Sequence, residues 1–166
     1  WSFMRNLCTL ITAATHMGQK KPGTELAGDW LKVRGLPEHL SEHFADLKDL
    51  GNIFETISHE EEYELSDEVG IEKKLSKLSR YTERLSDVIQ DELTAGRFVL
   101  TLGGDHSIAA GTVAASLRYD ENIKIVWVDA HADLNTPDTS PSHNTHGMPV
   151  ALAMGLIEEV KENNVF

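Results

Sequence analysis

The chain has 166 residues, 40% hydrophobic and 25% charged, so it can bury the core of one domain and is not globally disordered. Its formal net charge of −12 disfavours nucleic acids and anionic membrane surfaces as main partners, because both carry negative charge. No apolar run approaches the roughly 18 residues that span a bilayer. We therefore expect a globular protein with neither a nucleic-acid nor a membrane partner.

The single cysteine, Cys8, can form no internal disulfide. It lies in an apolar run, so we interpret it as a small buried hydrophobe rather than a nucleophile. A reducing compartment fits this cysteine usage, and we expect a cytoplasmic protein. Because the chain begins at Trp1 rather than Met, an upstream targeting segment and a mitochondrial location stay open.

In its first half the chain alternates between apolar and polar stretches. The pattern predicts a strand at residues 7–14, a loop at 16–23, a helix at 24–34, a short helix near 38–44 and a strand near 46–53. Thr24 is expected to cap the first helix and Gly35 to end it. The apolar residues of that helix fall on one face, which we expect to contact a core: Leu26, Trp30 and Val33.

The clearest helix is predicted at residues 69–93, where apolar residues recur at steps of three and four and the opposite face is charged. The acidic run at 59–68 before it predicts a solvated loop, and Gly96 after it ends the helix. Further elements then follow in order: a strand at 98–102 buried on both faces, an Ala-rich helix at 107–117 that packs on a sheet, a strand at 123–128, a long loop at 135–147, a helix at 150–154 opened by Pro149, a helix near 157–163 and the start of a strand at 165–166.

Strands that alternate with helices predict a parallel α/β sheet with helices on both faces. Ligands of such sheets bind beyond the carboxyl ends of the strands. Two conspicuous polar motifs fall there. The first is Gly-Gly-Asp-His at residues 103–106, and the second is Asp-Ala-His-Ala-Asp at residues 129–133.

The second motif places Asp129, His131 and Asp133 two residues apart, which puts them on one face of an extended backbone. Such ligands can converge on two metal ions about 3.5–4 Å apart. By itself the motif also fits capping and turn residues at a strand end. A second strand end that carries His106, after two glycines that allow close backbone approach, favours the metal site.

Two carboxylates and two imidazoles without a thiolate favour Mn(II) or a similar divalent ion over structural zinc. Two ions with roughly five or six ligands each need more donors than these four side chains. Asp105 and Asp138 are further acidic candidates, although nothing in their spacing marks them as ligands. The count therefore predicts that part of the site lies outside this chain.

Both motifs resemble the metal motifs of the arginases, within the manganese-dependent ureohydrolase family. The stretches Asp-Leu-Asn-Thr at 133–136 and Ser-His-Asn-Thr-His-Gly at 142–147 are similar to the arginase substrate loop rather than to the agmatinase loop. A weaker similarity covers the Gly-containing loop near residues 18–28. The resemblance runs over about residues 7–155 and implies a three-layer α/β/α fold with a mainly parallel sheet, incomplete at its C-terminal side.

The resemblance also implies roles for individual residues. His106 and Asp133 would bind one manganese ion, His131 the other, and Asp129 both. His146 would be the proton shuttle. The residues at the α-carboxylate end of L-arginine would be Asn135, Ser142 and Asn144. For His146 a loop histidine that caps a turn beside Gly147 is the plainer alternative.

The implied reaction is hydrolysis of L-arginine to L-ornithine and urea by a hydroxide that bridges two manganese ions. Arginases are commonly trimers or hexamers, so a homo-oligomer is expected. The family's later Asp-x-Asp motif has no counterpart in the sequence, which predicts that residues 1–166 are a single partial domain, the N-terminal half of an arginase, and inactive alone. His143 and Asp29 depart from the usual Gly and Pro of the family. An agmatinase-like enzyme, another guanidino-compound hydrolase and a non-catalytic metal-binding protein stay open as alternatives.

Overall fold

The computed structural model describes residues 6–54, 70–158 and 160 of the chain. The acidic loop predicted at 59–68, the strand start predicted at 165–166 and most of the helix predicted near 157–163 lie outside these residues. In the described part of the chain, no helix is both long enough and apolar enough to cross a membrane.

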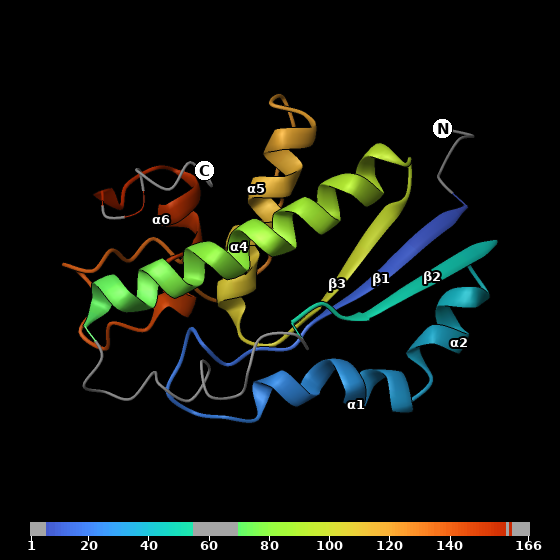
Figure 1. The fold of residues 1–166 in the computed structure, drawn as a ribbon, viewed down its shortest axis with the longest axis horizontal. Coiled ribbons are helices and arrows are strands. Elements are labelled where there is room, and N and C mark those ends of the chain that lie inside the picture. The colour runs from blue at the N-terminus through green and yellow to red at the C-terminus, as the bar shows by residue number, and fades with distance from the viewer. Residues whose placement is uncertain (1–5, 55–69, 159, 161–166) are drawn as a thin grey trace.

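A parallel sheet of three strands forms the centre of the molecule (Figure 1). Its strands are β1 (Leu7–Ala13), β2 (Asp46–Asn52) and β3 (Phe98–Gly103), in the order β2-β1-β3. β1 pairs with both neighbours in parallel register and is almost entirely buried. The three strands and their parallel pairing confirm the prediction.

Helices cover both faces of the sheet (Figure 1). On one face, Ile11 and Ala13 of β1 share a core with Leu75 and Leu78 of α4 (Ile71–Thr94). On the other face lies α1 (Ala27–Val33), followed by α2 (Leu36–Ser41). This arrangement confirms the predicted α/β class with helices on both faces.

α4 is the predicted long amphipathic helix, and its apolar stripe faces the core. Gly96, with φ of +78°, follows its end as expected. α5 (Ala109–Tyr119) also forms, but its small residues pack against α4 rather than against the sheet. A Cβ added at Gly111 of α5 would lie 2.9 Å from Cδ2 of Leu85 in α4, so the absence of a side chain there lets the two helices approach.

The first predicted helix is wrong in its cap and in its buried face. Residues Thr24–Leu26 form a 3₁₀ turn, and Gly23 rather than Thr24 precedes it, with no side-chain cap. α1 is only seven residues long and buries only Gly28, whose added Cβ would lie 2.5 Å from Cγ2 of Thr12. The helix therefore meets the sheet through backbone, and the predicted core residues point to solvent: Leu26, Trp30 and Val33 are 62%, 56% and 86% exposed.

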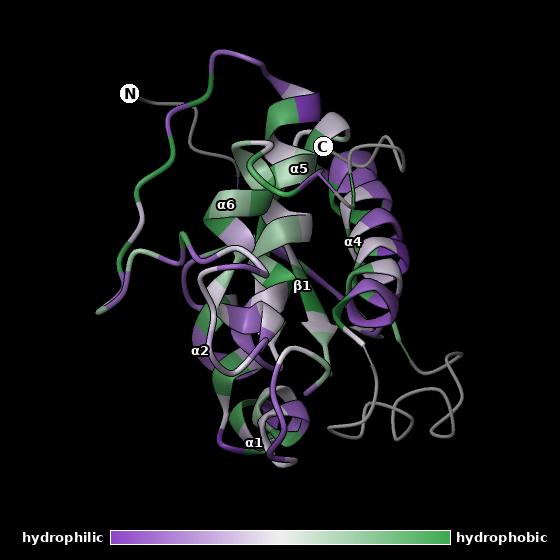
Figure 2. Cartoon of the chain, turned by 90° about the vertical axis from the view of Figure 1, so that its left-hand side faces the viewer, coloured by the Kyte–Doolittle hydropathy of each residue, from purple (hydrophilic) through white to green (hydrophobic). Residues whose placement is uncertain are grey.

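The strand predicted at residues 123–128 does not form, and Val126 and Val128 are 85% and 91% exposed. A strand requires a hydrogen-bonded neighbour, and this segment has none among the described residues. Figure 2 shows it as a single trace that leaves the end of α5. β3 likewise pairs only with β1 in the described part of the chain, and Phe98 is 47% exposed, so the prediction of burial on both faces of β3 is wrong at that residue.

The loop predicted at 135–147 and the short helix predicted after it both form. Residues 135–147 form a loop that ends in a 3₁₀ turn at Thr145–Gly147. α6 (Pro149–Ala153) begins at Pro149, as predicted. Its buried residues join the core on the α4 side, so the loop is anchored to the molecule just after its last turn.

Candidate metal centre

The first half of the site begins where β3 ends. The backbone at Gly104 passes close to the backbone that follows β1. A Cβ at Gly104 would lie 2.5 Å from the carbonyl oxygen of Thr15, so only glycine fits at this position. Asp105, which follows, accepts hydrogen bonds from the backbone N–H groups of Ser107 at 2.8 Å and Gly18 at 2.7 Å. Asp105 is therefore a structural residue that fixes the turn carrying His106, and its carboxylate is occupied.

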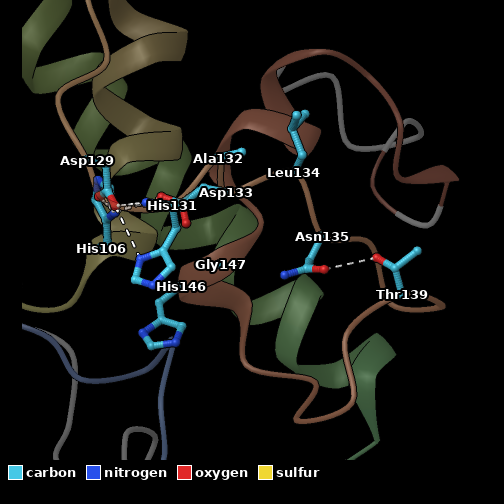
Figure 3. Close-up of a pocket in the computed structure, with 10 residues that line it drawn as sticks. All are labelled: His106, Asp129, His131, Ala132, Asp133, Leu134, Asn135, Thr139, His146 and Gly147. Carbon is cyan, nitrogen blue, oxygen red and sulfur yellow. Dashed lines mark hydrogen bonds and ion pairs between the residues drawn. The ribbon is translucent and has the colours of Figure 1, made fainter.

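Three predicted ligands converge beside this turn (Figure 3). Nδ1 of His106 lies 2.9 Å from Oδ2 of Asp133 and 3.2 Å from Oδ2 of Asp129. One ligand atom from each residue lies within 4.8 Å of the other two. Two carboxylates and one imidazole so placed can hold one divalent cation.

The environment of Asp133 fits a metal ligand. Its Oδ2 is buried and has no hydrogen-bond partner, because the short approach to His106 lacks hydrogen-bond geometry. A buried carboxylate oxygen that accepts no hydrogen bond is costly unless a cation compensates it. The backbone is also held in place: Asp133 has φ of +50°, and its carbonyl accepts bonds from the N–H groups of Val150 and Ala151 at the start of α6. These observations fit a divalent ion at the cluster.

Asp129 is kept ionised by its surroundings. A backbone hydrogen bond from His131, 2.8 Å from N to Oδ1, is the largest cause that lowers the pKa of Asp129, and the nearby imidazoles add to it. The low pKa favours the charged carboxylate, which is the form that binds metal.

His131 lies outside the three-residue cluster. Its Nδ1 is 3.4 Å from Oδ1 of Asp129, but its side chain is 82% exposed. Residues 129–131 form a bend rather than a strand, so the alternation that would place all three motif side chains on one face does not hold. His131 is nevertheless adjacent to the cluster and lines the same pocket.

Trp127 is a site residue that sequence reasoning missed. Its ring stacks on that of His106, with centroids 5.1 Å apart and an angle of 29° between the planes. The contact restricts the orientation of the His106 imidazole, as residues behind metal ligands commonly do. The only signal was the position of Trp127 two residues before Asp129, inside the apolar run that was assigned to a strand.

The cluster opens into a pocket with a volume of about 620 Å³, a size suited to a small molecule (Figure 3). Of the residues predicted to contact substrate, Asn135 and His146 line it, while Ser142 and Asn144 do not. Ser142 is exposed, and its Oγ accepts a bond from the backbone N–H of Asn144 at 3.3 Å. The pocket residues are His106, Asp129, His131, Ala132, Asp133, Leu134, Asn135, Thr139, His146 and Gly147.

Thr139 is a second pocket residue that was not predicted. Its Oγ1 donates to Oδ1 of Asn135 at 3.2 Å and accepts from the backbone N–H of Thr136 at 2.8 Å. Because Oδ1 of Asn135 is the acceptor, its amide nitrogen is left as the donor for a ligand. Asp138, the other acidic candidate, is exposed and does not line the pocket.

The fold and the cluster together define a parallel α/β protein with a carboxylate–imidazole cluster, able to hold a divalent ion, at the carboxyl end of its strands. The chain belongs to the arginase family, whose model matches residues 7–166. It is 36% identical to an arginase of Brevibacillus brevis, covering 92% of this chain and 49% of that protein. It is also 41% identical to an arginase of Neurospora crassa, covering 87% of this chain and 42% of that protein.

Solved structures give the same family. The Bacillus caldovelox arginase aligns with a TM-score of 0.81 and 32% identity, covering 98% of this chain and 54% of that chain. The Entamoeba histolytica arginase in complex with L-ornithine aligns with a TM-score of 0.80 and 30% identity, covering 97% of this chain and 54% of that chain. The chain thus spans about half the length of the relatives it matches.

Proposed function

We propose that the protein hydrolyses L-arginine to L-ornithine and urea at a site that holds two manganese ions. The observation that carries the proposal is the convergence of His106, Asp129 and Asp133 around a buried oxygen of Asp133 that accepts no hydrogen bond. Relatives named arginase, one of them in complex with L-ornithine, support the substrate. The chain's own charge distribution agrees, because a carboxylate-lined pocket attracts a cationic guanidinium.

In this proposal His106 and Asp133 hold one ion, Asp129 contacts both, and His131 holds the second. Bound metal ions would lower the pKa of a water molecule that they share towards neutrality. The exposed ring of His131 can reorient towards a ligand, because its side chain is 82% exposed. Trp127 keeps the ring of His106 in its orientation.

Substrate would enter beside Asn135 and His146. Asn135 offers its amide nitrogen to the α-carboxylate, since Thr139 occupies its oxygen. His146 is fixed through its backbone, whose N–H donates to the carbonyl of Gly18 at 3.0 Å, and its ring faces the pocket. An imidazole there can deliver a proton to the leaving amine, which must be protonated to depart.

The number of ligands indicates that the four proposed side chains do not complete the metal site. Four side chains cannot complete two ions that need roughly five or six ligands each. We infer that the remaining ligands come from outside the described residues and that residues 1–166 release little urea alone. Substantial urea release from L-arginine by this chain with manganese would refute that inference.

Metal content tests the ligand assignment. In an arginase-length protein that carries this segment, His131→Ala should lose one manganese equivalent and His106→Ala the other. His143→Ala is the matched control, since His143 is exposed and does not line the pocket. Unchanged manganese content in His131→Ala would remove that residue from the ligand set.

One observation supports a second candidate substrate class, agmatine or another guanidino compound. Ser142, expected to bind the α-carboxylate, is exposed and does not line the pocket. A protein that lacked this contact would discriminate less against agmatine or another guanidino compound. Comparing kcat/KM for L-arginine and agmatine decides between them, and metal binding without turnover of either would favour the non-catalytic alternative.

A further inference from the structure

A second group of metal-ligating side chains lies near the amino ends of the strands, whereas the candidate metal centre lies beyond their carboxyl ends. His39 is on α2, and Glu42 and His43 follow it in the turn that leads into β2. Figure 1 shows α2 next to the start of β2. One ligand atom from each residue lies within 4.8 Å of the other two. This cluster is at the amino end of the strands, whereas His106 follows the carboxyl end of β3.

The spacing of these residues places them on one side of a helical turn. Residues three and four apart along a helix have neighbouring side chains, and two histidines four apart form one half of a common zinc motif. Nδ1 of His39 lies 3.5 Å from Oε2 of Glu42. The rings of His39 and His43 are 5.1 Å apart, edge to face.

The backbone that carries the three side chains is fixed at both ends. Gly35, with φ of +91°, directly precedes α2, and the N–H of His39 donates to the carbonyl of Gly35 at 3.0 Å. At the other end, the N–H groups of His43 and Phe44 donate to the carbonyl of Leu40 at 2.9 and 3.0 Å. Phe44 then stacks on Phe98 of β3 with ring centroids 5.6 Å apart, which fastens the turn to the sheet.

The side chains themselves are available to a ligand from solvent. The side chains of His39 and Glu42 are 67% and 71% exposed, and His43 is also exposed. Rotamer changes at exposed positions can bring the three ligand atoms around one ion, each at the 2.0–2.2 Å distance that separates zinc from a nitrogen or oxygen ligand. The net charge of −12 adds a general attraction for cations.

We propose that His39, Glu42 and His43 form a surface site for a borderline divalent cation of the zinc class. Two imidazoles and one carboxylate suit zinc, with water in the fourth position, better than they suit manganese or magnesium, which prefer oxygen ligands. The bound ion fastens the end of α2 to the turn before β2. Because the fold holds the helical turn that aligns the three ligands, zinc binds the native state more tightly than the unfolded chain and stabilises it.

Calorimetric titration of the full chain with zinc chloride tests this site, in a His106→Ala background that disables the other cluster. One zinc equivalent should remain in that background. His39→Ala and His43→Ala should each weaken it at least tenfold, and Glu42→Gln should weaken it more than Glu38→Gln, the matched control on the same helix. Manganese should not bind at this position.

Folding is checked by circular dichroism and by Tm without metal, which the exposed substitutions should leave unchanged. Zinc should raise the Tm of the His106→Ala background and not that of the His39→Ala, His43→Ala variant of it. Zinc binding that survives loss of both histidines, or an equal effect of Glu38→Gln and Glu42→Gln, would overturn the proposal. None of these readouts depends on arginine hydrolysis, so the result is independent of the proposed function.

Discussion

At the scale of single residues, the backbone constrains which residue types fit at two positions near the metal cluster, Gly104 and His143. Gly104 crosses beside the carbonyl oxygens of Thr15 and Ala13, and an added Cβ would lie 2.5 and 2.6 Å from them. His143 adopts φ of +51° in the loop at residues 135–147. Both positions constrain the residue type through the backbone, independently of any ligand.

Gly104→Ala should lower the free energy of unfolding by about 1–3 kcal/mol, because the new methyl group meets backbone atoms that cannot rotate away. Urea denaturation measures the effect. Gly70→Ala is the control, since no atom lies within 4 Å of the corresponding Cβ and its φ is −57°. Equal stability of Gly104→Ala and the wild type would contradict the packing described at this crossing.

His143→Gly should raise the free energy of unfolding by about 0.5–1 kcal/mol. The left-handed conformation costs a side-chain-bearing residue about 1–2 kcal/mol, and the greater freedom of glycine in the unfolded chain offsets part of the gain. Asn144→Gly, at φ of −81° in the same loop, should instead destabilise. Thermal unfolding of the two variants compares them directly, and a loss in both would show that His143 is not strained.

At the scale of elements, a charged network joins α4 to the amino ends of the strands. Glu92 of α4 accepts bonds from Thr9 of β1 at 2.6 Å and Lys48 of β2 at 2.5 Å. Arg97, just before β3, donates to Thr9 at 2.6 Å and to the carboxylate of Asp46 at 2.5 Å. The sheet and its long helix are thus tied together by ionised groups as well as by the apolar core.

Acid should weaken this connection. Burial alone would raise the pKa of Glu92, but hydrogen bonds from Lys48 and Thr9 and the charges of Lys48 and Arg97 outweigh it, so the pKa is lowered from 4.5. Because the folded-state pKa is the lower one, the stabilisation is complete above the unfolded-state value and is lost as pH falls below 4.5 through the folded-state pKa.

Glu92→Gln should therefore cost about 1.5–3 kcal/mol at pH 7, a magnitude typical of hydrogen bonds to charged groups. The difference from wild type should shrink as the pH falls below 4.5. Urea denaturation at pH 7 and in this acidic range measures it. The control is Glu83→Gln on the exposed side of α4, which should change stability little at either pH. A difference between Glu92→Gln and wild type that does not vary with pH would rule out this ionisation as the cause.

At the scale of the whole molecule, the metal cluster joins two segments of the chain that α5 separates. His106 follows β3, Asp129 follows the exposed segment after α5, and Asp133 is bonded to the start of α6. An ion that contacts all three residues binds the folded chain and not the unfolded one. Metal binding should therefore stabilise the fold as well as supply chemistry.

Manganese at 100 times its dissociation constant should raise the free energy of unfolding by about 2.7 kcal/mol, and removal with a chelator should reverse the gain. Tm measured against manganese concentration checks this expectation. His106→Asn should abolish the response, whereas His143→Asn should retain it. A manganese effect of equal size in His106→Asn would place the ion elsewhere.

Much of the fold was predictable because local patterns determine it. The period of the apolar residues predicted α4, and the runs at 7–14, 46–53 and 98–102 predicted all three parallel strands. The strand predicted at residues 123–128 does not form. These residues have the composition of a strand, but no neighbouring strand pairs with them in the described part of the chain. The helix predicted at 24–34 forms in part, as α1, but its buried face was not predictable because a glycine contact, rather than its apolar side chains, faces the sheet.

The sequence by itself determined the family, the parallel α/β class and which side chains could bind a metal, since these follow from residue type and spacing. Only the tertiary structure decided how those side chains meet. It brought His106, Asp129 and Asp133 together, left His131 exposed, moved Ser142 out of the pocket and placed Trp127 against His106. The reason is physical: spacing constrains neighbours along a strand, whereas a bend at residues 129–131 and a positive φ at Asp133 redirect side chains in ways that depend on packing from elsewhere in the chain.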